Sequence, residues 1–247
     1  MIEKLKKYLK RNKLEKFDLK AVLFDMDGVL YDSMPYHASS WQETMEHYGF
    51  KQTKPEDFYL HEGRVATATI AMMIEEERGD TPSEEEVDEI YAHKSELFAQ
   101  RYNNELLDGA VDVVEWVKDK GLTPVLVTGS AQPTLLERLN EHFDDVFRPE
   151  TMVTAHDVKI GKPHPEPFLM GLQKGGDLEP HQAIVIENAP LGTEAAHKAG
   201  VFTIAVNTGP LDDQILWDSG ADVVLKSMTD LHDLLPDLLK EIDTLEI

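Results

Sequence analysis

The chain has 247 residues, which is enough to bury a sizeable core in one large domain or two modest ones. Its 24 basic and 47 acidic residues give a net charge of −23, which repels nucleic acid and anionic membranes and excludes both as expected partners. Because the sequence has no cysteine, no apolar run of membrane-spanning length and no signal-peptide pattern, it predicts a cytoplasmic protein without disulfides or thiolate chemistry.

The start of the chain carries the opposite charge to the remainder. Residues 1–20 hold eight basic and three acidic side chains, a net +5, which leaves the rest at −28. Ile2, Leu5, Tyr8 and Leu9 recur at helical spacing, so this segment is predicted to form a basic amphipathic lead helix. Such a helix either seeks an acidic surface or packs on its own acidic domain, and the short apolar stripe favours the second interpretation.

Two carboxylates one residue apart, Asp25 and Asp27, follow the apolar run Ala21–Phe24, which has the length of a strand. In a parallel sheet, ligands bind at the carboxyl ends of the strands, so chemistry is expected at Asp25. Two negative charges this close repel each other unless a cation or a shared proton lies between them, which suits a metal site. The alternative is a solvated turn, because Asp and Gly both favour turns.

The interval 34–105 has no comparable strand run. Its helix-like stretches lie around residues 37–48, 65–78 and 83–102. The last of them opens with Ser83 and Glu86 at capping-box spacing. We therefore predict a small helical cap domain at 34–105, inserted after the first strand, that lies over the acidic pair as a lid.

After the cap, strand-like apolar runs alternate with helical patterns. The runs cover residues 123–127, 183–186, 202–206 and 221–225. Together with the first strand, this alternation predicts an α/β fold with a Rossmann-like, doubly wound parallel sheet. The core domain is predicted to comprise residues 21–33 and 106–247.

Two further groups lie where a site should form. Thr128-Gly129-Ser130 follows the strand at 123–127, and its hydroxyl and backbone amides suit a phosphate oxygen. An ordinary loop with Ser130 as a helix cap is the alternative. Lys162 lies among prolines that rigidify its backbone, and a fixed ammonium neutralises both a carboxylate and a phosphoryl group. The alternative for Lys162 is a surface lysine.

An acid and an amide, Glu187 and Asn188, follow the strand at 183–186. They are either hard oxygen ligands that complete a magnesium site or ordinary loop and cap residues. In their order along the chain, these groups resemble the haloacid dehalogenase superfamily, in its branch of β-phosphoglucomutases and small-substrate phosphatases. The motifs are Asp25-Met26-Asp27-Gly28-Val29-Leu30, Thr128-Gly129-Ser130, Lys162-Pro163 and Glu187-Asn188, and the resemblance covers nearly everything from Lys20 to the carboxyl terminus.

The resemblance implies a role for each motif. Asp25 attacks phosphorus and becomes an aspartyl phosphate. Asp27 protonates the leaving oxygen and then deprotonates the attacking water or hydroxyl, which also tells against a dehalogenase, since carbon–halogen displacement needs no such acid. Thr128 and Lys162 bind the equatorial oxygens of the phosphoryl group.

The resemblance also implies Mg²⁺, held by Asp25, the carbonyl oxygen of Asp27 and Asn188, with Glu187 close by. Relatives usually carry Asp where this chain has Asn188. An amide oxygen coordinates Mg²⁺ without bringing charge, so weaker metal binding is expected. A degenerate relative that only binds phosphate is the non-catalytic alternative.

Residues of the cap and of the second motif bear on the choice between hydrolase and mutase. His37 and Trp41 follow the nucleophile at the spacing of the mutase branch, and Arg64 occupies a place similar to its lid arginine. Against a mutase, the second motif is followed by Ala131 and Gln132 instead of the lysine and asparagine that grip a second phosphate. Hydrolysis of a monophosphate needs no such grip.

Glu62, in the cap run His61-Glu62-Gly63-Arg64, raises a third possibility. An acid that faces an anionic substrate repels it unless a metal lies between, so Glu62 is predicted to reach the Mg²⁺ or its water and to compensate for Asn188. A lid closed so tightly leaves little room for a sugar and suits inorganic pyrophosphate. The alternative is that Glu62 pairs with Arg64 or caps the helix that follows.

The sequence therefore predicts a magnesium-dependent phosphohydrolase of small phosphorylated metabolites, either sugar phosphates or inorganic pyrophosphate. β-Phosphoglucomutase activity is the first alternative. No coiled-coil heptads are present, which favours a monomer without establishing the oligomeric state.

Overall fold

A six-stranded parallel sheet runs through the computed structural model, which describes residues 1–50, 54–130 and 135–245, without the side chains of 135–137. The strands are β1 (Ala21–Phe24), β2 (Thr123–Val127), β3 (Met152–Val153), β4 (Ala183–Glu187), β5 (Phe202–Val206) and β6 (Val223–Leu225). Their order in the sheet, β3-β2-β1-β4-β5-β6, is that of a doubly wound fold with its first strand at the centre. The predicted fold class is thereby confirmed.

The strand predictions differ from the structure at three places. The fourth strand continues one residue further than predicted, to Glu187, and the last begins at Val223 and not at 221. The strand β3 was missed, because two apolar residues carry no period that separates a strand from a loop.

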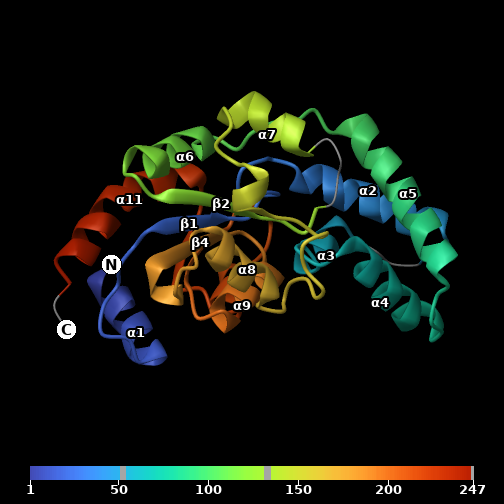
Figure 1. Cartoon of the computed structure of the whole chain (residues 1–247). Coiled ribbons are helices and arrows are strands. Elements are labelled where there is room, and N and C mark those ends of the chain that lie inside the picture. Colours follow the sequence, from blue (N-terminus) through green and yellow to red (C-terminus); the bar gives the residue numbers. More distant parts are fainter. Residues whose placement is uncertain (51–53, 131–134, 246–247) are drawn as a thin grey trace.

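Helices cover both faces of the sheet (Figure 1). On one face lie α6 (Ala110–Asp119), α7 (Leu135–Phe143) and α11 (Met228–Asp243), and on the other α8 (Glu166–Lys174) and α9 (Pro190–Lys198). The remaining core elements are α10 (Asp213–Asp218), beside β6 and α9, and the short 3₁₀ helices at Pro149–Thr151 and Pro180–Gln182.

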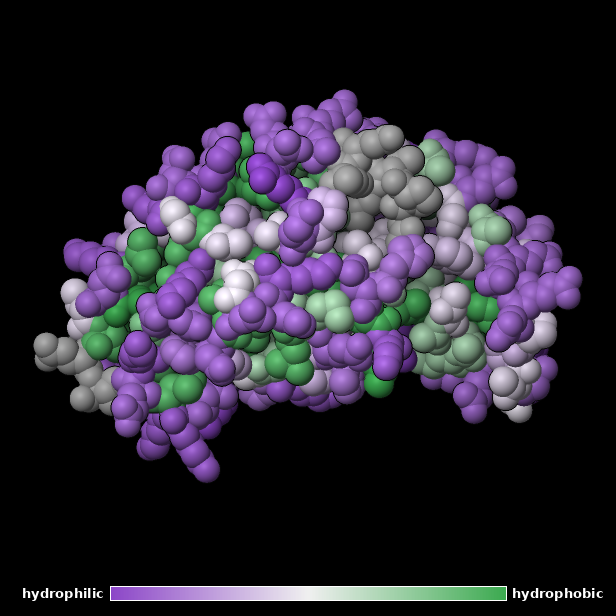
Figure 2. Space-filling model, viewed as in Figure 1, coloured by the Kyte–Doolittle hydropathy of each residue, from purple (hydrophilic) through white to green (hydrophobic). Residues whose placement is uncertain are grey.

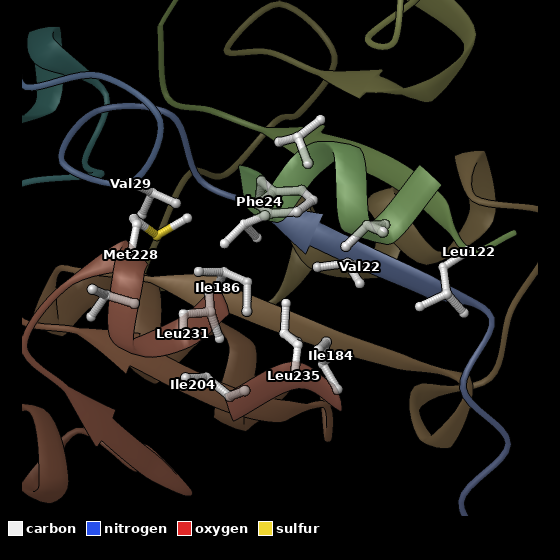
Figure 3. Close-up of a cluster of buried hydrophobic side chains, with 14 of the residues drawn as sticks. Val22, Phe24, Val29, Leu122, Ile184, Ile186, Ile204, Met228, Leu231 and Leu235 are labelled. Atoms are coloured by element: carbon white, nitrogen blue, oxygen red, sulfur yellow. The ribbon is translucent and has the colours of Figure 1, made fainter. Parts of the chain in front are cut away.

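Alternate residues of β1 serve the two faces, as the pleat of a strand requires. Val22 and Phe24 are fully buried with Leu231 and Leu235 of α11, and Figure 3 shows these side chains together. Leu23 points to the opposite face and packs in the cluster that includes α8 and α9. Because β1 is buried on both faces, its sequence is continuously apolar.

The lead helix α1 (Ile2–Asn12) packs on the core domain of its own chain. Leu5, Tyr8 and Leu9 are buried, and the Tyr8 hydroxyl donates to the carbonyl oxygen of Gly200 at 2.9 Å. Arg11 forms an ion pair of 2.8 Å with a core aspartate, Asp222. The favoured interpretation of the basic segment is therefore correct.

A helical cap lies between β1 and α6 in the sequence and beside the core in space (Figure 1). Its helices are α2 (Met34–His47), α3 (Pro55–Leu60), α4 (Ala66–Arg78) and α5 (Glu84–Arg101). They enclose a hydrophobic cluster of their own. Only half of the predicted capping box forms, because Ser83 accepts the N–H of Glu86 at 3.2 Å while the Glu86 carboxylate pairs with Arg78. The domain boundaries at 33 and 105 stay predictions.

The two chain crossings between core and cap run side by side. Tyr31 and Leu106 form an antiparallel bridge, and the N–H of Asp32 donates to the carbonyl oxygen of Glu105 at 2.9 Å. Since the first crossing leaves from the carboxyl end of β1, this pairing places the cap over that edge of the sheet.

The outer surface agrees with the composition. Figure 2 shows a face on which hydrophilic side chains predominate. In the described ranges, no helix is both long enough and apolar enough to cross a membrane.

Candidate active site

Three adjacent strands bring predicted site residues to one edge of the sheet. Thr128 directly follows β2, Asp25 directly follows β1, and Glu187 is the last residue of β4. All three side chains are buried. The parallel register of β2, β1 and β4 is therefore what gathers them, as the topology predicted.

Lys162 lies between two of these carboxylates. Its ammonium contacts Asp25 Oδ1, Glu187 Oε1 at 2.7 Å and the carbonyl oxygen of Val127 at 3.1 Å. Burial lowers the pKa of Lys162, but the carboxylates of Asp25 and Glu187 outweigh it and hold the pKa above its ordinary value. Lys162 is only 2% exposed, so the alternative of a surface lysine is wrong.

Asp25 lies in an environment that resists a second negative charge. Burial raises the pKa of Asp25 to about 7, and the Glu187 carboxylate adds to the rise while Lys162 opposes it. One ammonium thus faces two buried carboxylates. A divalent cation at this point would stabilise both in their ionised form.

Asp27 is held in the loop that follows β1. Gly28 adopts a left-handed φ of 78°, which lets its N–H donate to the carbonyl oxygen of Tyr31 at 2.8 Å. The Ser33 hydroxyl donates to Asp27 Oδ1 at 2.5 Å, and His37 Nε2 lies 3.4 Å from the same oxygen. Burial opposes ionisation of Asp27, but His37 and Ser33 outweigh it and lower the pKa to about 2.

A cap lysine that the sequence analysis missed completes this group. Lys94 Nζ lies 2.6 Å from His37 Nδ1 and above the rings of Trp41 and Phe98, at 5.2 and 4.9 Å from their centroids. Burial lowers the pKa of Lys94 to about 7 and also lowers that of His37. A sequence signal existed, because Lys94 interrupts the apolar face of α5 at helical spacing between Ile90 and Phe98.

Glu62 of the cap reaches the core amide Asn188. The Asn188 Nδ2 donates to both carboxylate oxygens of Glu62, at 2.9 and 3.0 Å. Burial, with Asp25 next, raises the pKa of Glu62 well above its ordinary value. Among the described residues no ion pair joins Glu62 to Arg64, so the sequence alternative of such a pair is wrong.

Two glycines make room for these polar side chains. A Cβ on Gly28 would lie 2.0 Å from Asn188 Nδ2, and a Cβ on Gly192 would lie 1.7 Å from Glu187 Oε1. Glu187 Oε2 accepts the N–H of Asn188 at 2.9 Å and that of Ala189 at 3.1 Å. The acid-amide pair is thus fixed by the backbone that follows β4.

The donors at this edge suit Mg²⁺ as a mixed set and not as a cluster of acids. Over the described part of the chain, no three acidic, histidine or cysteine side chains converge as metal ligands. Asn188 Oδ1 is buried and accepts no hydrogen bond there, which is the state of an oxygen available to a cation. Carboxylate, amide and main-chain oxygens together fit a hard divalent ion.

The cap is closed tightly on the core. A Cβ on Gly129 would lie 3.0 Å from the carbonyl oxygen of Gly63, and a Cβ on Gly161 would lie 2.8 Å from Val65 Cγ2. The cavity between cap and core has a volume of about 100 Å³. Nine of the predicted site residues line it: Asp25, Asp27, His37, Trp41, Glu62, Arg64, Thr128, Gly129 and Ser130. Ala131 and Gln132, which argued against a mutase, lie outside the described residues.

The hydrogen-bond donors of the cavity come from both the cap and the core. Arg64 of the cap lines it, and the buried Nε of Arg64 has no hydrogen-bond partner in the described part of the chain. The amide of Ser130 donates to Thr128 Oγ1 at 3.0 Å, which fixes the hydroxyl oxygen, and both residues line the same cavity. These groups are arranged to receive an anion.

Comparison with known proteins agrees with this geometry. A family model described as haloacid dehalogenase-like hydrolase matches residues 22–206. Hexitol phosphatase A of Escherichia coli K12 is 31% identical over 85% of this chain and 91% of its own. Pyrophosphatase PpaX of Bacillus pumilus is 27% identical over 86% of this chain and 94% of its own.

A solved structure is closer still in sequence. It is described as "Putative beta-phosphoglucomutase from Bacteroides vulgatus", is 48% identical and superposes with a TM-score of 0.93. The match covers 98% of this chain and 97% of the other. These similarities confirm the resemblance that the four sequence motifs predicted.

Proposed function

The chain belongs to the haloacid dehalogenase-like hydrolase family, and we propose that within it the protein is a Mg²⁺-dependent phosphohydrolase whose preferred substrate is inorganic pyrophosphate. It is an enzyme, and it acts on small phosphorylated substrates, as its phosphatase relatives do. The observation that carries the narrower choice is the contact of Glu62 with Asn188.

Asp25 and Asp27 divide the chemistry. A carboxylate oxygen of Asp25 attacks phosphorus, the bond from phosphorus to the leaving oxygen breaks, and an aspartyl phosphate forms. Asp27, oriented by Ser33 and His37, is ionised in the free site, so it first takes up a proton when the anionic substrate binds. It gives this proton to the leaving oxygen and later takes one from water. That water attacks phosphorus, the bond to Asp25 breaks, and inorganic phosphate is released.

Thr128 and Lys162 stabilise the charge on the phosphoryl oxygens. The ammonium of Lys162 already lies against Asp25, so it neutralises the attacking carboxylate and the transferred group in turn. Gly129 contributes its backbone amide beside the Thr128 hydroxyl, and the Ser130 amide, which donates to Thr128 Oγ1, holds that hydroxyl in place. In this class of reaction, catalysis is mainly positioning and charge stabilisation.

The residues that fit Mg²⁺ are Asp25, the main-chain carbonyl oxygen of Asp27 and Asn188, with Glu62 and Glu187 nearby. Bound there, the ion would draw phosphoryl oxygens toward Asp25 and neutralise their charge. Asn188 supplies no charge, and Glu62 supplies one carboxylate from the cap. The metal site of this proposal is therefore complete only when the cap is closed.

The closed cap also limits the size of the substrate. Ligand pockets for drug-sized molecules start at roughly 300 Å³, whereas this cavity holds about 100 Å³. Pyrophosphate has no sugar to accommodate, and its second phosphate is a compact anion that suits Arg64 and Lys94, two cations that line the cavity. A carboxylate at Glu62 is tolerated beside such an anion only with a cation between them.

A mutase is the second candidate, on one specific observation. The structure that is 48% identical is described as "Putative beta-phosphoglucomutase", and His37 and Arg64, which match the mutase branch in their sequence positions, line the cavity. Supplying β-glucose 1-phosphate with a trace of the bisphosphate separates the two candidates. Glucose 6-phosphate as the product supports the mutase, and free phosphate supports the hydrolase.

A substrate panel tests the proposal directly. Purified protein with Mg²⁺ is offered pyrophosphate, an aryl phosphate and a set of hexose and hexitol phosphates, and phosphate release is measured. We expect kcat/KM to be highest for pyrophosphate and activity to vanish with a chelator. A preference for any sugar phosphate contradicts the pyrophosphate assignment. If no substrate in the panel releases phosphate, the proposal of a phosphohydrolase is contradicted.

Glu62→Gln separates the cap carboxylate from the rest of the site. We expect kcat/KM for pyrophosphate to fall roughly 100-fold, because a charged contact is worth about 2–3 kcal/mol, and more Mg²⁺ to be needed for half-maximal rate. Glu56→Gln, an exposed acid in the first turn of α3, is the matched control and should change neither quantity. An unchanged rate and Mg²⁺ requirement in Glu62→Gln would remove the idea.

The partners in this proposal are the small phosphorylated substrate and Mg²⁺. The cytoplasmic location, the monomeric state and the exclusion of nucleic acid and membranes stay predictions of the sequence. Sedimentation of the purified protein tests the monomer.

A further inference from the structure

Lys162 is carried by a loop that has no regular secondary structure. Residues 154–165 join β3 to α8, and Lys162 lies near the end of this segment. A loop lacks the hydrogen-bond ladder of a strand or a helix, so its backbone donors need other acceptors. The precision of the Lys162 contacts with Asp25 and Glu187 therefore requires an anchor close to it.

The carboxylate of Glu166 supplies such an anchor. Its Oε1 accepts the N–H of Lys159 at 2.9 Å, and its Oε2 accepts the N–H of Ile160 at 3.2 Å. Each carboxylate oxygen thus holds one of two consecutive amides, two and three residues before Lys162. The Ile160 side chain is 52% exposed, so hydrophobic burial does not fix this part of the loop.

The helix that carries Glu166 is a rigid support. Glu166 is the first residue of α8, and Phe168 and Leu172 of this helix are buried against the sheet. The far end of α8 holds the start of the same loop, where Lys174 pairs with Asp157 at 2.8 Å. Side chains of α8 thus bind both ends of the loop, and Glu166 binds the end that carries Lys162.

The same stretch of loop receives the cap. Gly161 lies between the anchored amides and Lys162, and a Cβ there would meet Val65 Cγ2 at 2.8 Å. Gly63 of the cap lies against Lys162 itself, since a Cβ on Gly63 would be 3.0 Å from Lys162 Cδ. A displacement of the loop would therefore move two things at once. These are the Lys162 ammonium and the surface against which the cap closes.

We propose that Glu166 is a positioning residue for Lys162, whose carboxylate fixes the loop at residues 159–160 and so sets the ammonium between Asp25 and Glu187. The catalytic part of this inference rests on the proposed function, in which Lys162 binds the phosphoryl group. Glu166 itself contacts neither substrate nor metal in this account.

Glu166→Gln tests the proposal with little change of shape. The amide keeps one acceptor oxygen and turns N–H donors toward the second loop amide, so one of the two contacts is lost. We expect hydrogen exchange at one of the amides of 159 and 160 to accelerate at least tenfold, since its hydrogen bond to a charged acceptor is lost. Glu84→Gln is the control, because Glu84 is likewise the first residue of a helix, α5, and is exposed.

The kinetic expectation separates positioning from general loosening. We expect kcat for the best substrate to fall about tenfold or more while KM stays within roughly threefold, since Lys162 acts mainly on charge that develops in the transition state. Glu84→Gln should alter neither kcat nor exchange at 159–160. Unchanged kcat in Glu166→Gln, or a loss that lies in KM, overturns the positioning role.

A crystal structure of Glu166→Gln decides the inference without reference to activity. Displacement of the Lys162 ammonium from Glu187 agrees with it, and retention of that contact overturns it, as does unchanged exchange at 159–160. An inactive parent protein would contradict the proposed function alone, because the exchange and crystallographic results would still decide the role of Glu166.

Discussion

Lys94 is a buried cation whose nearest polar neighbour is a histidine. Burial lowers its pKa to about 7 from the usual 10.5. A lysine whose pKa is depressed on folding binds more protons in the unfolded chain between these two values, so its cost to stability is full below pH 7 and fades as the pH rises toward 10.5. The charge therefore destabilises the fold at neutral pH, which is consistent with a functional role in the cavity.

Lys94→Met should accordingly stabilise the protein in a pH-dependent way. Met fills the same space between Trp41 and Phe98 without a charge, so we expect the free energy of unfolding at pH 6.5 to rise on the order of a few kcal/mol. The difference from the parent should shrink by pH 9.5. Urea unfolding at both pH values measures it, and a gain that is equal at both, or no gain, would contradict the depressed pKa.

At the level of single residues, the sequence was sufficient where a residue belongs to a contiguous motif. The grouping of Asp25, Lys162 and Asn188 at one edge of the sheet was predicted because each lies in a short run whose order along the chain is informative. Lys94 was not predicted, because its place in the cavity depends on which face of α5 is turned toward His37. Glu62 was identified as an acid facing an anion, but its contact with Asn188 is set by cap closure and not by local sequence.

Among the elements, glycines lie where core and cap approach closely. Gly161 leaves room for the side chain of Val65, and Gly63 leaves room for the side chain of Lys162, so the loop before α8 and the turn before α4 approach closely. Adding a methyl group at such a contact costs about 1–3 kcal/mol when neighbours cannot move. The closed state is thus sensitive to a single carbon atom.

Gly161→Ala should prevent full closure of the cap, since the added Cβ would meet Val65 Cγ2 at 2.8 Å. We expect kcat/KM for pyrophosphate to fall roughly tenfold or more, because a cost of about 1.4 kcal/mol in closing the cap corresponds to a factor of ten in rate. The double variant Gly161→Ala with Val65→Ala removes the clash and should regain most of the loss. If the second substitution restores nothing, contact at this point does not govern closure.

Long elements with a clear period were predictable from sequence, and short ones were not. The strands β1, β2 and β5 have the predicted bounds, because continuous apolar runs of four or five residues mark buried parallel strands. The two-residue β3 and the six-residue α3 are defined by packing against neighbours and carry no period of their own. The early start predicted for the last strand failed because Asp222 turns back to Arg11 and to the N–H of Thr203.

At the scale of the whole molecule, a strongly acidic chain carries a basic helix that completes its core. The helix α1 buries its apolar side chains in the same cluster as α6 and α11, and Arg11 offsets a half-buried aspartate. The basic helix α1 thus finds an acidic partner, Asp222, within its own chain. Removing the helix would expose part of the main hydrophobic core.

Leu5→Ala tests this placement of the lead helix. Leu5 is fully buried, so its truncation should lower the free energy of unfolding by about 2–5 kcal/mol. Lys7→Ala, on the exposed side of the same helix, should change it by less than about 0.5 kcal/mol. A loss below about 1 kcal/mol for Leu5→Ala, measured by urea unfolding, would mean that α1 is a detachable appendage.

The covalent intermediate at Asp25 is the most direct test of the account as a whole. Protein mixed with Mg²⁺ and pyrophosphate is quenched in acid during turnover, digested, and its peptides are weighed by mass spectrometry. We expect the peptide that contains Asp25 to gain the mass of one phosphoryl group, and we expect neither the adduct nor phosphate release from Asp25→Asn. Turnover of pyrophosphate with no adduct at Asp25, or with undiminished rate in Asp25→Asn, would contradict the mechanism.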